Sequence, residues 1–176
     1  MVKTTILKKT LFVILTLFFI CSIAFASNNV EIYTNKEYGF RINLPNGWIN
    51  RESGFPSIIR FKKENAPPSE PLPDLSIGIG PLDPKYNDKS PIDMLSEMGS
   101  TSKVAFVEEP REFEQNGLKG ARYIVQNNWH RKLTIIFFGR GNIYTILFTA
   151  RKDTFEQDYK EIENSIKSFE LISTKS

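Results

Sequence analysis

Apolar and polar residues alternate over several stretches in the first half of the chain, which is the period of a β-strand with one buried face. The alternation is clearest from Phe40 to Leu44 and from Leu75 to Gly80, and Ser57 to Lys63 predicts a further strand between them. Pro45-Asn46-Gly47 closes the first of these strands as a turn. The first half therefore predicts short strands joined by turns, with an exposed, proline-containing loop at 63–74.

The second half of the chain predicts two β-hairpins, over residues 104–129 and 132–151. Asn116-Gly117, a strong signal for a two-residue hairpin turn, lies in the first, and Gly139 to Asn142 forms the turn of the second. The strands of the second hairpin carry apolar side chains on both faces. A strand that is buried on both faces needs cover on both, so helices or loops are expected above and below this sheet.

Two helices are predicted. The first begins at Ser90, a good N-cap, with Pro91 at the first helical position. The second begins at Asp153, which can form a capping box with Glu156. Its apolar residues follow at steps of four and three: Phe155, Tyr159, Ile162, Ile166 and Phe169. They form one stripe, which is typical of a helix that covers a sheet, and the chain as a whole is predicted to be an α+β protein.

The first 26 residues have the layout of a secretory signal peptide. A lysine-containing start precedes an apolar run from Leu11 to Ile20, and Ala24-Phe25-Ala26 supplies an A-x-A cleavage site. The apolar stretch is shorter than the roughly 20 residues that a membrane-spanning helix needs. We therefore expect cleavage after Ala26, a periplasmic or secreted protein, and a single domain over residues 27–176.

Two alternatives for this segment stay open. Residues 1–26 could be retained as an anchor, which would give a membrane-tethered interaction domain. Cys21 could carry a lipid, as in lipoproteins, although Phe18-Phe19-Ile20 before it is bulkier than lipoprotein signals generally have. Cleavage after Ala26 would instead remove the one cysteine of the chain, which leaves the domain without a disulfide or a thiolate ligand.

The net charge of the chain depends on whether the predicted signal peptide is counted. The 176 residues include 23 Lys and Arg against 20 Asp and Glu, a formal net charge of +3. Three of the basic residues, Lys3, Lys8 and Lys9, lie in the predicted signal peptide, so 20 basic residues face 20 acidic ones in the remainder. A neutral domain without a basic stripe and interleaved aromatics argues against a nucleic-acid partner.

Candidate chemistry is sparse. The one histidine, His130, cannot form a multi-histidine metal site. The two GxG triplets, Gly78-Ile79-Gly80 and Gly139-Arg140-Gly141, do not continue into a phosphate-binding loop, so no cofactor is expected. Glu108 and Glu109 are neighbours on a predicted strand and point to opposite faces. Trp129, His130 and Arg131 could form a binding patch, because an aromatic plane beside a cation suits anionic or aromatic ligands.

Two motifs resemble the opening of PsbP-like domains: Tyr38-Gly39-Phe40, followed by Pro45-Asn46-Gly47-Trp48. The resemblance implies an α/β/α sandwich, with a central antiparallel sheet flanked by helices. Family members are typically exported or lumenal non-enzymatic proteins, and those of plants and cyanobacteria support photosystem II. No position here matches the metal-associated histidines of the photosynthetic members, so metal binding is not carried over.

The sequence therefore predicts an exported, non-catalytic accessory or binding protein. Its partner would be an unknown protein or small ligand in the cell envelope, with a membrane involved only if residues 1–26 are retained. The alternative from another class is a periplasmic hydrolase that uses serine and carboxylate groups, whose arrangement in space the sequence alone leaves open.

Overall fold

The computed structural model describes residues 30–65, 73–98 and 105–173. The predicted signal peptide, its cleavage site and Cys21 lie outside these ranges, and so does part of the proline-containing loop. Within the described ranges, no helix is both long enough and apolar enough to cross a membrane.

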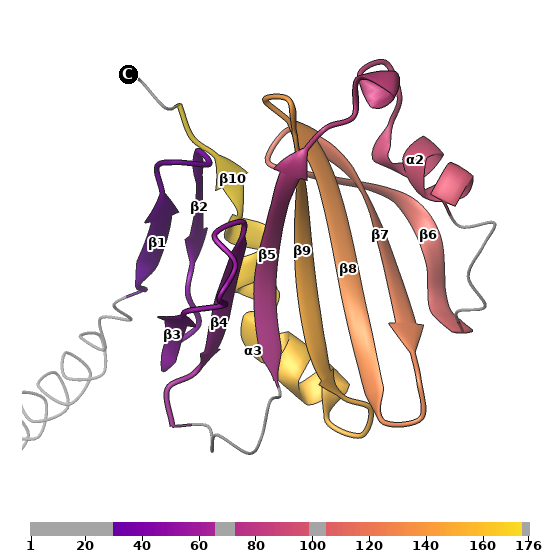
Figure 1. The fold of residues 1–176 in the computed structure, drawn as a ribbon. Helices are drawn as coiled ribbons and strands as arrows, with labels where there is room; N and C mark the ends of the chain where they lie inside the picture. The colour runs from indigo at the N-terminus through magenta and orange to yellow at the C-terminus, as the bar shows by residue number, and fades with distance from the viewer. Residues whose placement is uncertain (1–29, 66–72, 99–104, 174–176) are drawn as a thin grey trace, which may run out of the picture.

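Ten strands form two antiparallel sheets (Figure 1). The strands of the larger sheet are β3 (Trp48–Arg51), β4 (Ile58–Lys63), β5 (Asp74–Pro81), β6 (Ala105–Gln115), β7 (Leu118–Gln126), β8 (His130–Gly139) and β9 (Asn142–Arg151). Their order across the sheet is β3-β4-β5-β9-β8-β7-β6. The smaller sheet consists of β1 (Ile32–Asn35), β2 (Phe40–Asn43) and β10 (Glu170–Leu171), in the order β1-β2-β10. Its third strand comes from near the end of the described chain, so β1 and β10 lie on either side of β2 and each pairs with it.

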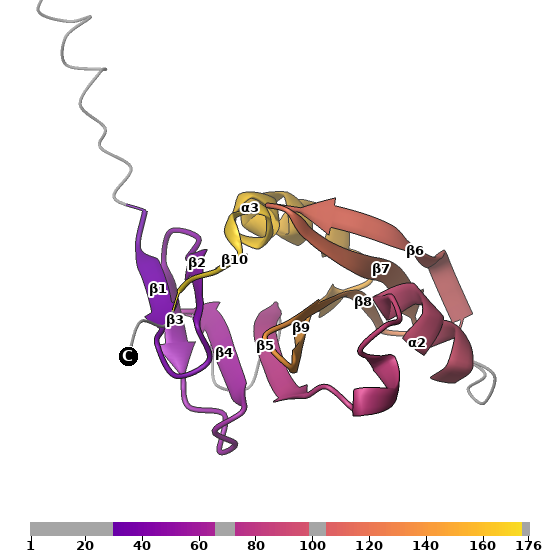
Figure 2. The same ribbon diagram turned by 90° about the horizontal axis from the view of Figure 1, so that it is seen from above.

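The helices lie on opposite faces of the larger sheet (Figure 2). One face is covered by α3 (Phe155–Ser168), and the other, at one end, by the 3₁₀ helix η1 (Pro84–Tyr86) and by α2 (Pro91–Met98). This arrangement confirms the predicted α+β class and the α/β/α sandwich.

Burial on both faces of β8 explains why its sequence does not alternate. Leu133, Ile135 and Phe137 point to the α3 side, where they belong to the main core with the apolar stripe of that helix. Ile136 points to the other face and packs with Met94 of α2. The predicted need for cover on both faces is therefore met by two different helices.

The two helix starts differ in how well the sequence predicted them. Ser90 and Asp93 cap α2 reciprocally, since the Ser90 backbone N–H donates to the Asp93 carboxylate at 2.9 Å. The capping box predicted at Asp153 is wrong: α3 has Thr154 as its N-cap, without a side-chain capping bond. Asp153 instead accepts hydrogen bonds from Arg151, and a charge-assisted pair of this kind outcompetes a neutral backbone donor.

Asp74 is a buried carboxylate on the sheet face that points away from α3. It pairs with the partly exposed Arg60 at 3.1 Å. Burial raises the pKa of Asp74 above its ordinary value of 3.8, although the charges of Arg60 and Lys62 oppose the shift. A carboxyl group whose pKa is raised on folding stabilises the protein below its unfolded pKa, and that contribution is lost as pH rises through the folded pKa.

An Asp74→Asn variant should therefore gain stability relative to the natural protein as the pH rises from about 4 to 7. The amide does not ionise, so it avoids the cost of a buried charge. Urea unfolding of both proteins at the two pH values measures the difference in free energy directly. A difference that stays constant with pH would show that the Asp74 carboxyl has its ordinary pKa.

Candidate functional site

The structure does not bring together the three side chains of the predicted binding patch. Trp129 lies in the turn before β8, with 76% of its surface exposed. His130 is the first residue of β8 and pairs with Arg151 of β9, while Arg131 lies opposite Ala150. Successive strand residues point to opposite faces, so His130 faces away from α3 and Arg131 faces toward it. Binding by all three residues stays a prediction. Arg131 lies in a different site, beside α3.

Arg131 is held between the sheet and the first turn of α3. Its Nη1 donates to the Glu156 carboxylate at 2.7 Å, and its guanidinium lies 5.3 Å from the centroid of the Phe155 ring. Only 19% of the side chain is exposed. Among the described residues, nothing accepts a hydrogen bond from its buried Nε. This arginine is therefore closely packed and ion-paired, but one of its buried donors lacks an acceptor among these residues.

A second ion-paired group lies beside Arg131, on β6 and β7, and consists of Glu108 with Arg111 and Arg122. The Glu108 carboxylate accepts a hydrogen bond from Arg122 Nη2 at 3.0 Å and another from Arg111 Nε at 2.6 Å. Burial alone would raise the pKa of Glu108, but the hydrogen bonds and charges of the two arginines together lower it below its usual value. Glu108 is thus held as a carboxylate, which makes it a structural counterion rather than a proton donor.

The Arg131–Glu156 and Arg122–Glu108 pairs line a pocket of about 380 Å³ between α3 and strands β6 to β8, which we call the α3 pocket. Its lining residues are Val107, Glu108, Arg122, Ile124, Arg131, Phe155, Glu156 and Tyr159. The volume lies in the range of small-molecule sites. Two guanidinium groups among apolar and aromatic walls provide recognition for a small anion that also has an apolar body.

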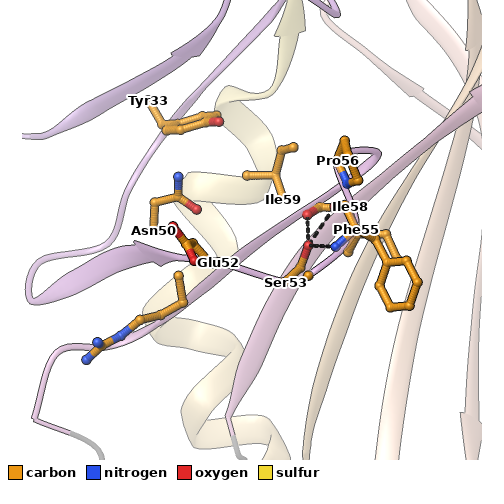
Figure 3. Close-up of a pocket in the computed structure, with 10 residues that line it drawn as sticks. Tyr33, Asn50, Glu52, Ser53, Phe55, Pro56, Ile58 and Ile59 are labelled. Carbon is orange, nitrogen blue, oxygen red and sulfur yellow. Dashed lines mark hydrogen bonds between the residues drawn. The ribbon is translucent and has the colours of Figure 1, made fainter.

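A second, shallower depression of about 310 Å³ lies at the edge of the larger sheet, next to β1 (Figure 3). Tyr33, Asn50 and Ile59 line one side, and the Phe55 ring points away from them. The Ser53 hydroxyl donates to the Phe55 carbonyl at 2.7 Å and accepts from the Phe55 N–H at 3.2 Å. These hydrogen bonds close the turn before β4. The Ser53 hydroxyl is therefore bonded to the backbone and is not poised as a nucleophile.

A serine–carboxylate pair and metal ligands are the other candidate chemistry of the sequence. The Ser90 hydroxyl bonds the Asp93 carboxylate at 2.7 Å, but this serine–carboxylate pair is the N-cap of α2. Within the three described ranges, no three His, Cys, Asp or Glu side chains are grouped closely enough to hold a metal ion.

Comparison with known proteins bears on the fold. No protein-family model and no curated protein sequence matches this chain. The solution structure of cyanobacterial PsbP (CyanoP) from Synechocystis is similar to it with a TM-score of 0.56 at 15% identity, over 81% of this chain and 92% of that one. The chain has a PsbP-like fold. The resemblance found in the sequence is thereby confirmed at the level of the fold.

A second solved structure is also similar to this chain in its fold. It comes from Bacteroides thetaiotaomicron, with a TM-score of 0.57 and 15% identity over 82% of this chain. The present chain spans about half of that protein, since 49% of it is covered. At this level of identity both likenesses concern the fold, and the site must be argued from the residues of this chain.

The sequence did contain a signal for the α3 pocket. Arg131 is in phase with Leu133 and Ile135, and Arg122 is in phase with Ile124, so each arginine stands on the apolar face of its strand. A cation on a buried face needs a counterion or a ligand. The aromatic wall formed by Phe155 and Tyr159 was missed as part of a site because their spacing also fits an ordinary core helix.

Proposed function

We propose that this protein is an exported, non-catalytic binding protein whose α3 pocket takes a small anion with an apolar body. The observation that carries the proposal is Arg131, a mostly buried guanidinium over the Phe155 ring, whose Nε has no hydrogen-bond acceptor among the described residues. Its present partner Glu156 is 73% exposed, so an incoming anion can replace that carboxylate at small cost. The ligand's apolar part would lie against Tyr159 and Ile124.

The absence of catalysis in this proposal is supported by the hydrogen bonds that already engage one carboxylate and two serine hydroxyls. Glu108 is tied to two arginines, and the hydroxyls of Ser53 and Ser90 are tied to a turn and a helix cap. The PsbP-like fold favours the same conclusion. Export is supported by the layout of residues 1–26, which predicts cleavage after Ala26.

Replacing Arg131 should weaken binding of an amphipathic anion. Decanoate is a suitable probe in calorimetric titration of the exported protein, and decyltrimethylammonium is its cationic match. An Arg131→Gln variant is expected to bind decanoate roughly 10-fold or more weakly, because a charge-assisted hydrogen bond is lost. Arg151→Gln is the matched control, since it removes the same charge at the neighbouring strand end but on the opposite face. Equal binding of both probes, or equal weakening in both variants, would refute the assignment of this pocket.

Mass spectrometry of the protein recovered from expression of the full chain tests the proposed export. An N-terminus at Ser27 is the expected result. An intact Met1 would show that residues 1–26 are retained as an anchor. A lipid on Cys21 as the new N-terminus would show a lipoprotein, and either of these two results would overturn cleavage after Ala26.

A further inference from the structure

The described residues cover only part of the sheet face that points away from α3. Figure 2 shows α2 beneath β7 and β8, and no described helix beneath β3, β4 or β5 in that view. The covering cluster is centred on Tyr86, Met94 and Ile136, toward the end of β8 that leads into the second hairpin turn. The other half of this face, at the opposite end of β8, lacks such an apolar cluster among the described residues. It carries basic side chains instead.

Strand pairing places basic side chains across this half. Lys62 and Lys132 lie in one row, with Asp74 and Thr149 between them on the intervening strands. Three strand spacings separate the two lysines, about 14 Å. The adjoining rows add further arginines on the same face, and we call the following set the basic half-face: Arg51, Arg60, Lys62, Lys132 and Arg151. Arg51, Lys132 and Arg151 are exposed, and the other two are half-buried.

One pair of cross-strand neighbours on the basic half-face consists of two arginines. Arg51 lies directly opposite Arg60, and like charges in that position destabilise a sheet. Asp74 offsets part of this, since it pairs with Arg60, and Asp153 pairs with Arg151. Lys62 and Lys132, however, have no carboxylate in their row besides Asp74. An arrangement that costs stability without a packing gain is better explained by an anionic partner than by the fold.

The basic half-face also polarises the molecule. On the opposite side of the sheet, α3 carries four carboxylates and two lysines. The basic half-face therefore differs in charge from α3, although the basic and acidic residues after position 26 cancel in number. A charge asymmetry of this kind orients a protein over a charged surface.

Exposed aromatic residues border the same half. Phe106 of β6, with 39% of its surface exposed, lies opposite Val125, which in turn lies opposite Lys132. Trp129, 76% exposed, lies in the turn at the same end of the sheet, next to His130. An acidic protein would complement the charges alone, whereas tryptophan and phenylalanine beside lysines also suit the interfacial region of a bilayer.

We propose that the basic half-face docks on the surface of an anionic lipid bilayer, with Trp129 entering the headgroup region. The interaction is peripheral and reversible, because each basic side chain near the surface contributes modestly and is screened by salt. This site is separate from the α3 pocket, which opens on the other face of the sheet. The inference therefore goes beyond the proposed function and does not depend on decanoate binding.

Sedimentation with phosphatidylcholine vesicles, with and without phosphatidylglycerol, tests the proposal. The exported protein should bind the phosphatidylglycerol vesicles at low salt and be released at high salt. A Lys62→Gln/Lys132→Gln variant should bind roughly 30-fold more weakly. The matched control Lys36→Gln/Lys160→Gln removes two exposed lysines outside the basic half-face and should bind like the natural protein. Asp74→Asn should bind more tightly, because it removes the carboxylate at the centre of the patch.

Tryptophan fluorescence gives an independent readout. The chain has two tryptophans, and Trp48 is only 1% exposed, so a blue shift on adding phosphatidylglycerol vesicles reports Trp129. The shift should disappear in a Trp129→Phe variant. All variants share one N-terminus, so the differences between them report the folded part whichever way residues 1–26 are processed.

Three results would overturn the proposal. One is equal binding to vesicles with and without phosphatidylglycerol. Another is equal weakening in both lysine variants, which would reflect net charge only. The third is binding to soluble polyglutamate without binding to vesicles, which would assign the basic half-face to an acidic protein. Decanoate titration of the same variants should be unchanged, so failure here and failure of the α3 pocket can be told apart.

Discussion

A Phe169→Ala variant is expected to lose about 3–5 kcal/mol of unfolding free energy, because it empties a fully enclosed ring site. The Phe169 ring stacks on Phe137 at 5.8 Å between centroids, and it lies 5.5 Å from Phe40 and 6.0 Å from Tyr144. Phe40 belongs to the smaller sheet, and the other two belong to the larger one. The ring is therefore the contact through which both sheets and the end of α3 share one core.

Urea unfolding followed by circular dichroism measures this loss. The hydrogen bonds that Gln115 and Asn116 donate to the Phe169 carbonyl involve the backbone, so alanine keeps them and the change isolates the ring. Phe55→Ala is the control, since 66% of that residue is exposed and its loss should cost no more than about 0.5 kcal/mol. Similar costs for the two variants would mean that the end of α3 does not close the core as described.

Local pattern predicted most of this core. The stripe from Phe155 to Phe169 has the helical period, and Phe155, Ile162, Ile166 and Phe169 are all buried. The alternation of Phe40 to Leu44 likewise placed Phe40 and Ile42 in the interior. These predictions succeeded because a periodic apolar face can be satisfied in one way, against another apolar face.

The pattern was less informative where pairing is long-range. The row that joins Lys62, Asp74 and Lys132 depends on β5 pairing with β9, strands that are far apart in the chain. A sequence in which basic and acidic residues balance in number does not show which of them share a face. The basic half-face therefore became visible only with the strand order.

The α3 pocket shows an intermediate case. Arg131 was singled out with Trp129 and His130 because the three are adjacent in sequence, but adjacency on a strand sends neighbours to opposite faces. Its true neighbours, Phe155 and Glu156, follow more than 20 residues later at the start of α3. The structure therefore gives Arg131 neighbours that the sequence did not indicate, and its part in binding stays a prediction.

Gly120→Ala is expected to destabilise the protein by about 1–3 kcal/mol or more, although no sequence signal marks this glycine. Gly120 lies opposite Phe137 in the ladder of β7 and β8. A methyl group there would meet the Phe137 ring at 2.6 and 2.9 Å and would overlap the backbone carbonyl of Ile136. Neither neighbour can move freely, because Phe137 is fully buried and stacked on Phe169.

Two other glycines of the larger sheet provide matched controls. At Gly80 of β5, no described heavy atom beyond its chain neighbours lies within 4 Å of an added Cβ, so Gly80→Ala should be neutral or stabilising by up to about 1 kcal/mol. At Gly139 the added Cβ meets mainly the Leu171 side chain, which can rotate away, so the cost should be intermediate. Urea unfolding should therefore rank the three variants with Gly120→Ala the least stable and Gly80→Ala the most stable. If Gly120→Ala matched Gly80→Ala, β7 and β8 could separate enough to admit a methyl group, and the tight approach of Gly120 to Phe137 would not contribute to the stability of the core.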